Sequence, residues 1–274
     1  MSKALWPAVS GAIARDAQVE VIANNLANAN TNGFKRDDVS FKEYLSKNEN
    51  MDDLRMDIPR SPVKDKDLYH LEGRDQSFVI VNGTHTKFSQ GAMKVTDNPL
   101  DLALNGPGFF EVATPAGVRY TRAGSFKISN EGRLVTSEGN PVLSAGGIGT
   151  DEGDVAGRYI NLAGREGTIH INDQGELYMN DEKVAQLSVV EFENTDPLRK
   201  TGSSNFENKD PKRAPASIAS QTWVKQGMVE TSNVNPVQEV SNLIRANRMF
   251  EQDLKAMKTV NEMMQREVND ISKI

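Results

Sequence analysis

The chain of 274 residues contains no cysteine, and this absence excludes several kinds of site. Disulfide bridges, thiolate nucleophiles and zinc sites built on sulfur all require cysteine. A cysteine-free chain can serve in an oxidising or a reducing compartment, so the absence leaves its location open.

Long apolar runs are also missing. No stretch approaches the roughly 20 apolar residues of a membrane-spanning helix, so we expect no membrane insertion. Within residues 1–20, Ser10, Arg15 and Asp16 interrupt the apolar segment that a secretory signal needs, so no cleaved signal is expected. The formal net charge of -6 disfavours nucleic acid as a partner.

Residues with catalytic chemistry are few and scattered. His70, His85 and His170 lie far apart and lack the spacing of metal ligands. The acidic run at residues 151–154 lacks the alternating oxygen ligands of a calcium loop, and no lysine of a phosphate-binding loop follows Gly108. The sequence therefore predicts no catalytic residue, metal, cofactor or small-molecule substrate, and the chain is predicted not to be an enzyme.

What the sequence does contain is an order of three zones: helical, β-rich, helical. Hydrophobic residues make up 37% of the chain and charged residues 26%, which favours a folded core. The predicted fold class is α+β, with terminal helices that pair as a coiled-coil-like layer and a central all-β domain. The expected divisions are an N-terminal helix at 1–35, a charged linker at 36–75, a β-rich domain at 76–222, and a C-terminal helix with its lead-in at 223–274.

The N-terminal zone follows a heptad pattern. Positions a are Leu5, Ala12, Val19 and Leu26, and positions d are Ala8, Arg15, Ile22 and Ala29. Such a seam is typical of a helix that pairs with another helix. Residues 30–33 predict the helix end, because Gly33 readily adopts a left-handed conformation.

The C-terminal zone has a stronger heptad pattern. Positions a are Val240, Asn247, Leu254, Asn261 and Val268, and positions d are Leu243, Phe250, Met257, Met264 and Ile271. Asparagine at a fixes register at a cost in stability. Pro236 suits the first helical turn. A further apolar stripe through Ile244, Val260 and Met263 predicts contact with more than one helix.

The central zone is typical of an all-β domain. Short apolar runs alternate with Gly, Asn, Asp and Pro turns. The runs are Ser77–Val81, Leu100–Leu104, Phe109–Ala113, Val118–Thr121, Ser125–Ile128, Leu134–Thr136, Leu177–Met179 and Leu187–Glu193. Residues 194–217, rich in proline and charge, predict a long loop or a sheet edge.

Four motifs resemble, in order, the flagellar rod and hook proteins. They lie at residues 21–36, 89–110, 120–139 and 226–251. The residues that carry the first and last motifs are Asn24, Asn25, Leu26, Ala27, Asn28, Gly33, Phe34, Gly227, Ser232, Asn233 and Val234. Because the four span nearly the whole chain, the resemblance is highly specific.

The resemblance implies a structural subunit of the flagellar basal-body rod, exported through the flagellar secretion apparatus without a cleaved signal. Its terminal helices would form an inner layer around a channel with the β domain outside. Its partners would be other rod proteins and copies of itself. Two features favour a proximal-rod over a distal-rod member. They are the charged, glycine-poor segment at residues 46–70 and the sequence Asn98-Pro99-Leu100-Asp101.

Terminal helices are the predicted assembly interface. The candidate residues are Leu5, Trp6, Ile22, Asn25, Leu26, Asn28, Val240, Leu243, Asn247, Phe250, Leu254, Met257 and Met264. For Asn28 helix capping is an equal alternative, and Trp223 suits either an interface or a strand core. A different class of function also stays open, namely a β-domain binding module on a coiled-coil stalk that closes into a dimer or trimer.

Overall fold

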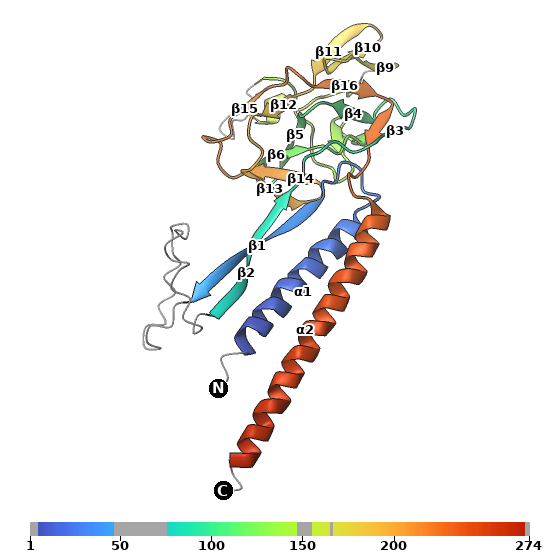
Figure 1. The fold of residues 1–274 in the computed structure, drawn as a ribbon. Coiled ribbons are helices and arrows are strands. Elements are labelled where there is room, and N and C mark those ends of the chain that lie inside the picture. The colour runs from blue at the N-terminus through green and yellow to red at the C-terminus, as the bar shows by residue number, and fades with distance from the viewer. Residues whose placement is uncertain (1–4, 47–75, 147–154, 165–166, 272–274) are drawn as a thin grey trace. The chain divides into compact units, whose positions relative to one another are not determined.

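The computed structural model describes residues 5–46, 76–146, 155–164 and 167–271 (Figure 1). The chain divides into two compact units. The helical unit comprises Met1–Ala23, Val39–Thr84 and Gln238–Ile274, and the β-rich unit comprises Asn24–Asp38 and His85–Val237. Both units are discontinuous in sequence, so each contains segments from both halves of the chain.

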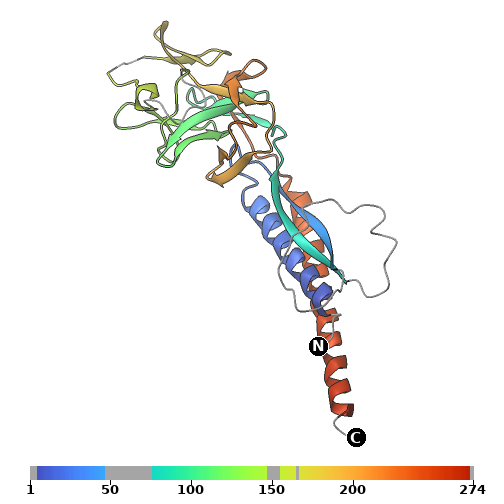
Figure 2. The same cartoon turned by 90° about the vertical axis from the view of Figure 1, so that its left-hand side faces the viewer.

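The helical unit contains two long helices and a strand pair. Helix α1 spans Leu5–Ala27, helix α2 spans Pro236–Ile271, and β1 (Asp37–Ser46) pairs with β2 (Gln76–Thr86). The two helices lie side by side and run in opposite directions in both views (Figures 1 and 2). A Cβ atom on Gly11 of α1 would lie 3.9 Å from Oδ2 of Asp253 on α2. The predicted terminal helices are thus confirmed, while their coiled-coil pairing stays a prediction.

Helix α1 ends as the sequence predicts. Its last residue is Ala27, and Gly33 has a φ of +69°, which is the expected left-handed conformation. Of the predicted seam, Ala12 and Ile22 are buried and Val19 is half-buried, whereas Ile13 is 62% exposed on another face.

Helix α2 begins at Pro236, as predicted. Its covered side is made of two heptad rows, which contain the buried or half-buried residues Glu239, Leu243, Ala246, Phe250, Asp253, Met257 and Val260. The d positions of the predicted seam therefore lie on this side. The predicted a row does not, because Val240 is 43% and Leu254 is 44% exposed.

The β-rich unit is built around a six-stranded sheet, with the strand order β13-β14-β6-β5-β12-β15. Its strands are β5 (Phe109–Thr114), β6 (Gly117–Thr121), β12 (Val189–Phe192), β13 (Leu198–Gly202), β14 (Asn205–Asn208) and β15 (Ala216–Ile218). The pairs β5–β6, β6–β14 and β5–β12 are antiparallel. A 3-10 helix, η2, spans Val155–Arg158.

Smaller strand groups complete this unit. Strand β3 (Met93–Val95) pairs with β17 (Met228–Glu230), β4 (Leu102–Asn105) with β16 (Trp223–Gln226), and β7 (Phe126–Ile128) with β8 (Leu134–Thr136). Strands β9 (Ile169–Ile171), β10 (Glu176–Met179) and β11 (Glu182–Gln186) form a three-stranded sheet. Strands β16 and β17 precede α2 directly, so this helix starts from the β-rich unit.

Strand β5 is the centre of the core. Alternate side chains of a strand point to opposite faces, and both faces of β5 are buried. Phe110 and Val112 belong to one hydrophobic cluster, and Phe109 and Ala113 belong to the other. The continuous apolar run at 109–113 is explained by this double burial.

The predicted β-rich zone is confirmed, but the linker contains an unexpected strand. Residues 37–46, expected as the start of a charged linker, form β1, while the rest of that segment, 47–75, lies outside the described residues. Polar Ser40 and Lys42 alternate here with Val39 and Phe41, a period-2 pattern that the acidic composition concealed. Residues 194–217 provide both edge strands of the six-stranded sheet, β13 and β15.

Candidate functional site

The motif residues from both ends of the chain meet inside the β-rich unit. The last turn of α1 from Asn24, the turn at Gly33 and the segment before α2 with Asn233 all belong to it. They surround three charged side chains, Lys35, Arg122 and Glu230, which are 0%, 1% and 0% exposed. We call this cluster of Asn25, Gly33, Lys35, Arg122, Glu230 and Asn233 the buried joint.

Gly33 is the point of closest approach in the buried joint. Its N–H donates to the carbonyl of Glu230 at 2.8 Å, which ties the segment after α1 to β17. A Cβ atom at this position would lie 2.3 Å from the backbone nitrogen of Ala123. Both the positive φ and the lack of space therefore require glycine here.

Replacing Gly33 by alanine is expected to lower the free energy of unfolding by at least about 2 kcal/mol, since strain and a backbone clash add together. Gly139 is the matched control, because its φ is +88° but nothing lies within 4 Å of an added Cβ. Gly139→Ala should cost only the strain of about 1–2 kcal/mol. Urea unfolding of both variants measures the difference, and equal losses would contradict the steric role of Gly33.

Glu230 holds the two cations of the buried joint together. Its Oε1 lies 2.5 Å from Nζ of Lys35, and its Oε2 lies 3.3 Å from Nη1 of Arg122. Oε1 also accepts the N–H of Gly91 at 2.8 Å, and Lys35 donates to the carbonyl of Ser89 at 2.9 Å. One carboxylate thus links segments that are about 200 residues apart in sequence, as the separation of 195 between Lys35 and Glu230 shows.

Burial dominates the electrostatics of this cluster. Desolvation lowers the pKa of Lys35 below its ordinary value, and the Glu230 carboxylate opposes that shift. Desolvation also lowers the pKa of Arg122, again against Glu230. The Arg122 guanidinium lies over the Phe109 ring at 4.9 Å, which offsets part of its lost hydration. Glu230 therefore offsets part of the cost of burying both cations.

Two asparagines complete the buried joint by bonding to backbone. The side chain of Asn25 donates to the carbonyl of Asp37 at 2.8 Å and accepts the Asp37 N–H at 3.0 Å. Oδ1 of Asn233 accepts the N–H of Arg36 at 2.7 Å, while its Nδ2 donates to the carbonyl of Lys87 at 2.8 Å. These side chains add to the few backbone hydrogen bonds of the segment at residues 33–37.

The other motif residues also have local structural roles. Nδ2 of Asn28 donates to the carbonyl of Asn24 at 2.9 Å, which is the helix-capping role weighed for it. Gly227 has a φ of +73° and its carbonyl accepts the N–H of Thr96 at 2.8 Å. Ser232 accepts the N–H of Val234, whose side chain is 6% exposed. Asn25 and Asn28 thus have partners within the chain, and their contact with another subunit stays a prediction.

The predicted interface residues of α2 fall into two groups. Leu243, Phe250 and Met257 are half-buried within the helical unit, whereas Val240, Asn247 and Leu254 are exposed. The exposed row of α2 can contact a neighbouring subunit, whereas the half-buried row is partly covered by the chain itself. The side chains of Leu5, Trp6 and Met264 lie outside the described ones.

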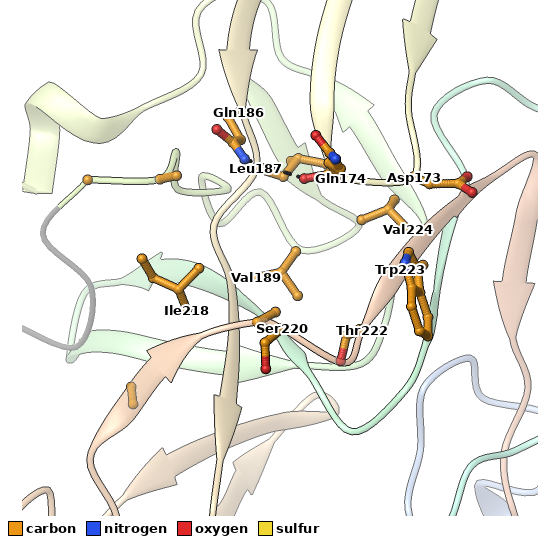
Figure 3. Close-up of a pocket in the computed structure, with 14 residues that line it drawn as sticks. Asp173, Gln174, Gln186, Leu187, Val189, Ile218, Ser220, Thr222, Trp223 and Val224 are labelled. Atoms are coloured by element: carbon orange, nitrogen blue, oxygen red, sulfur yellow. Dashed lines mark hydrogen bonds between the residues drawn. The ribbon is translucent and has the colours of Figure 1, made fainter.

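A pocket of about 730 Å³ lies beside β15 and β16 in the β-rich unit (Figure 3). Trp223 lines it and is 50% exposed, so this tryptophan is not a core residue. Asp173, the one carboxylate among the described lining residues, pairs with Lys225 at 2.8 Å. Among the described residues that line it there is no histidine or lysine beside a serine or threonine, so these residues provide no nucleophile with its base.

In the part of the chain that the structure describes, no three His, Cys, Asp or Glu side chains gather as metal ligands. Neither described helix is long and apolar enough to span a membrane.

Sequence reasoning missed the three charged residues of the buried joint. Lys35, Arg122 and Glu230 look like surface residues, because charged side chains are rarely buried without partners. Gly33, two residues before Lys35, is the one local signal, since a glycine can mark close backbone approach, and the contact of Glu230 with Gly91 exists only in the folded chain.

Three family models match the chain in sequence order. The model described as flagella basal body rod protein matches residues 7–35, which include α1 and Gly33. The model described as flagellar hook protein FlgE/F/G D1 domain matches residues 103–179. The model described as flagellar basal body rod FlgEFG protein C-terminal matches residues 225–271, which include Glu230 and α2.

Curated relatives match over nearly the whole chain. It is 32% identical to the flagellar basal-body rod protein FlgF of Caulobacter vibrioides, with 100% of both chains covered. It is 31% identical to the flagellar basal-body rod protein FlgG of Buchnera aphidicola subsp. Schizaphis graminum, with 97% of this chain and 98% of the relative covered. Identity to FlgG of Bacillus subtilis is 32%, with 98% and 99% covered.

Proposed function

The chain belongs to the flagellar basal-body rod proteins of the FlgF and FlgG type, and from this premise we propose that it polymerises through its terminal helices into the tubular drive shaft between motor and hook. It is a structural subunit of the flagellar basal body. Its relatives are structural proteins and not enzymes.

The single observation that carries the polymerisation proposal is the uncovered apolar row of α2. Val240, Ile244 and Leu254 are 43%, 49% and 44% exposed, although they lie on the same helix as a half-buried row. A helix with two apolar sides requires more than one partner to bury them. Neighbouring subunits provide the second partner, and contacts that repeat without closing generate a helical tube.

The buried joint supports the same proposal from within the chain. It bonds the segment after α1 and the segment before α2 to each other within the β-rich unit, so both motif-bearing segments belong to one folded unit. We propose that residues 1–35 and 223–274 form the inner layer of the rod and that the β-rich domain at 76–222 lies outside it.

We further propose that the chain is a proximal-rod subunit of the FlgF type. Relatives of both types match at 31–32% identity, so identity does not separate them. The support comes from residues 46–70, which are charged and poor in glycine, and from Asn98-Pro99-Leu100-Asp101. A distal-rod subunit of the FlgG type is the second candidate.

Electron microscopy of basal bodies from a strain that lacks this chain tests both proposals. We expect rods that stop within their proximal part and an immotile strain, both restored by the intact chain. A rod that is complete except for its distal part would assign the chain to the FlgG type. Full-length rods without the chain would contradict the structural role itself.

Membership of the rod family argues against the alternative function, a binding module on a coiled-coil stalk. A binding module on a coiled-coil stalk would share the helix–β–helix order, but it would not share both terminal rod segments and the intervening domain with rod proteins. The helices are therefore interpreted as assembly elements and not as a stalk.

A further inference from the structure

The helical unit presents two exposed patches of opposite charge. The acidic patch on α1 consists of Ile13, Asp16 and Glu20, spaced as i, i+3 and i+7 on one helix face. All three side chains are exposed, with Ile13 at 62%.

The basic patch lies on α2. It is a shallow groove of about 460 Å³ lined by Ser241, Ile244, Arg245, Arg248, Met249 and Gln252. Both arginines are exposed, and Ile244 and Met249 are 49% and 37% exposed. Each patch therefore combines apolar side chains with two charges of a single sign.

The four charged side chains have no partner within the described part of the chain. Asp16 and Glu20 form no side-chain hydrogen bond or ion pair there, and Arg245 and Arg248 form none either. Elsewhere the protein pairs many of its exposed charges, as in Lys87 with Asp38. Two adjacent arginines beside exposed isoleucine and methionine are typical of a contact surface.

The spacing of the two patches matches in the antiparallel orientation. Gly11 lies level with Asp253 across the helix pair. At 1.5 Å rise per residue, moving five residues along each helix, about 7.5 Å, brings Asp16 level with Arg248. Four residues further, Glu20 is level with Ile244 and Arg245. A neighbouring copy in the same orientation, displaced sideways, therefore presents its acidic patch at the height of this basic patch.

We propose that the basic patch on α2 of one subunit binds the acidic patch on α1 of a second copy of this chain. Asp16 pairs with Arg248, Glu20 pairs with Arg245, and Ile13 packs against Met249. This inference rests on the proposed polymerisation through terminal helices and adds the faces and the partner. Because the contact joins two different surfaces, it repeats from copy to copy without closing a dimer.

A charge swap tests this contact in a strain that lacks the native chain. Arg245→Glu with Arg248→Glu, or Asp16→Lys with Glu20→Lys, places like charges opposite one another. Each double variant should reduce the fraction of basal bodies with complete rods at least about tenfold, because it replaces two attractive charge pairs by two repulsive ones. Combining all four substitutions restores the opposite charges and should restore complete rods and swimming.

Lys255→Glu with Lys258→Glu is the matched control, since both lysines are exposed on α2 outside the groove. This control should assemble like the native chain. Unfolding in urea should be the same for all variants, so that a loss of rods reports the contact and not the fold. Double variants that assemble normally would overturn the inference, while immotility of the deletion strain would still support a rod function. Failure of the fourfold variant to rescue both doubles would also overturn the pairing.

Discussion

Glu230→Gln is expected to lower the free energy of unfolding of the full chain by about 3–5 kcal/mol, the usual cost of removing one partner of a buried ion pair. Glutamine has nearly the same shape, so the loss comes from charge and not from volume. Lys35 and Arg122 would keep two positive charges at positions that are 0% and 1% exposed. Urea unfolding followed by circular dichroism measures the change.

Glu131→Gln is the matched control for this prediction. Glu131 pairs with Arg133 at 3.0 Å, but its side chain is 69% exposed, so the substitution should cost no more than about 1 kcal/mol. A Glu230→Gln variant as stable as the Glu131→Gln variant would contradict the role of the buried joint.

The cost of Glu230→Gln should also depend on pH. Burial lowers the pKa of Lys35 in the folded chain, so the unfolded chain binds this proton more tightly. The loss of folding free energy from burying the charged Lys35 is complete below the folded pKa of Lys35, and it disappears as pH rises toward the ordinary value of 10.5. Without Glu230 the folded pKa falls further. The difference in unfolding free energy between native chain and variant should therefore be smaller at about pH 9 than at about pH 7.

Phe250→Asp is expected to abolish rod assembly and swimming while the β-rich unit stays folded. Phe250 lies in the half-buried row of α2 between Leu243 and Met257, where a carboxylate would lose part of its hydration. Truncation of a fully buried phenylalanine costs about 3–5 kcal/mol; the half-buried Phe250 would lose part of that amount, and the charge adds a desolvation cost. Soft-agar swimming and electron microscopy of basal bodies measure the effect on assembly.

Thr259→Asp is the control on the same helix. Thr259 is exposed, and its hydroxyl donates to the carbonyl of Lys255, so a carboxylate there keeps its hydration. This variant should swim normally. Normal swimming of the Phe250→Asp variant would instead show that the row of Phe250 does not contribute to the rod.

Much of the fold could be predicted from local pattern. Heptad spacing located both helices, Pro236 and Gly33 marked their ends, and turn residues separated the strands. These signals are local because caps and turns act through the backbone of adjacent residues. Strand β1 was missed because its alternation lies in an acidic segment that resembled a linker.

The choice between rows of α2 could not be made from hydrophobicity. Val240 and Leu254 are more apolar than Glu239 and Asp253, yet the row that contains Glu239 and Asp253 is less exposed than the row that contains Val240 and Leu254. Ala246, which is 3% exposed and lies in the row of Glu239 and Asp253, explains why this row is covered. Its small side chain lets a neighbouring element approach the helix closely. A helix with several partners has more than one apolar row, and one sequence does not assign partners to rows.

The buried joint depends on long-range contacts that no local pattern encodes. Lys35, Arg122 and Glu230 come from three segments, and only the fold brings the two cations within 3.3 Å of the Glu230 carboxylate. The motifs around them were identified by resemblance, and the structure supplies the physical reason for Gly33, Asn25 and Asn233. The contacts of α1 and α2 with neighbouring subunits stay predictions.

Cryo-electron microscopy of basal bodies purified from the native strain tests the central claim most directly. The claim is that the terminal helices build the inner layer of the rod through contacts between subunits. We expect α1 and α2 of this chain to line the channel, with Arg245 and Arg248 against Asp16 and Glu20 of a neighbouring copy. A reconstruction with the helices on the outer surface, or with subunits joined through their β-rich units alone, would contradict it.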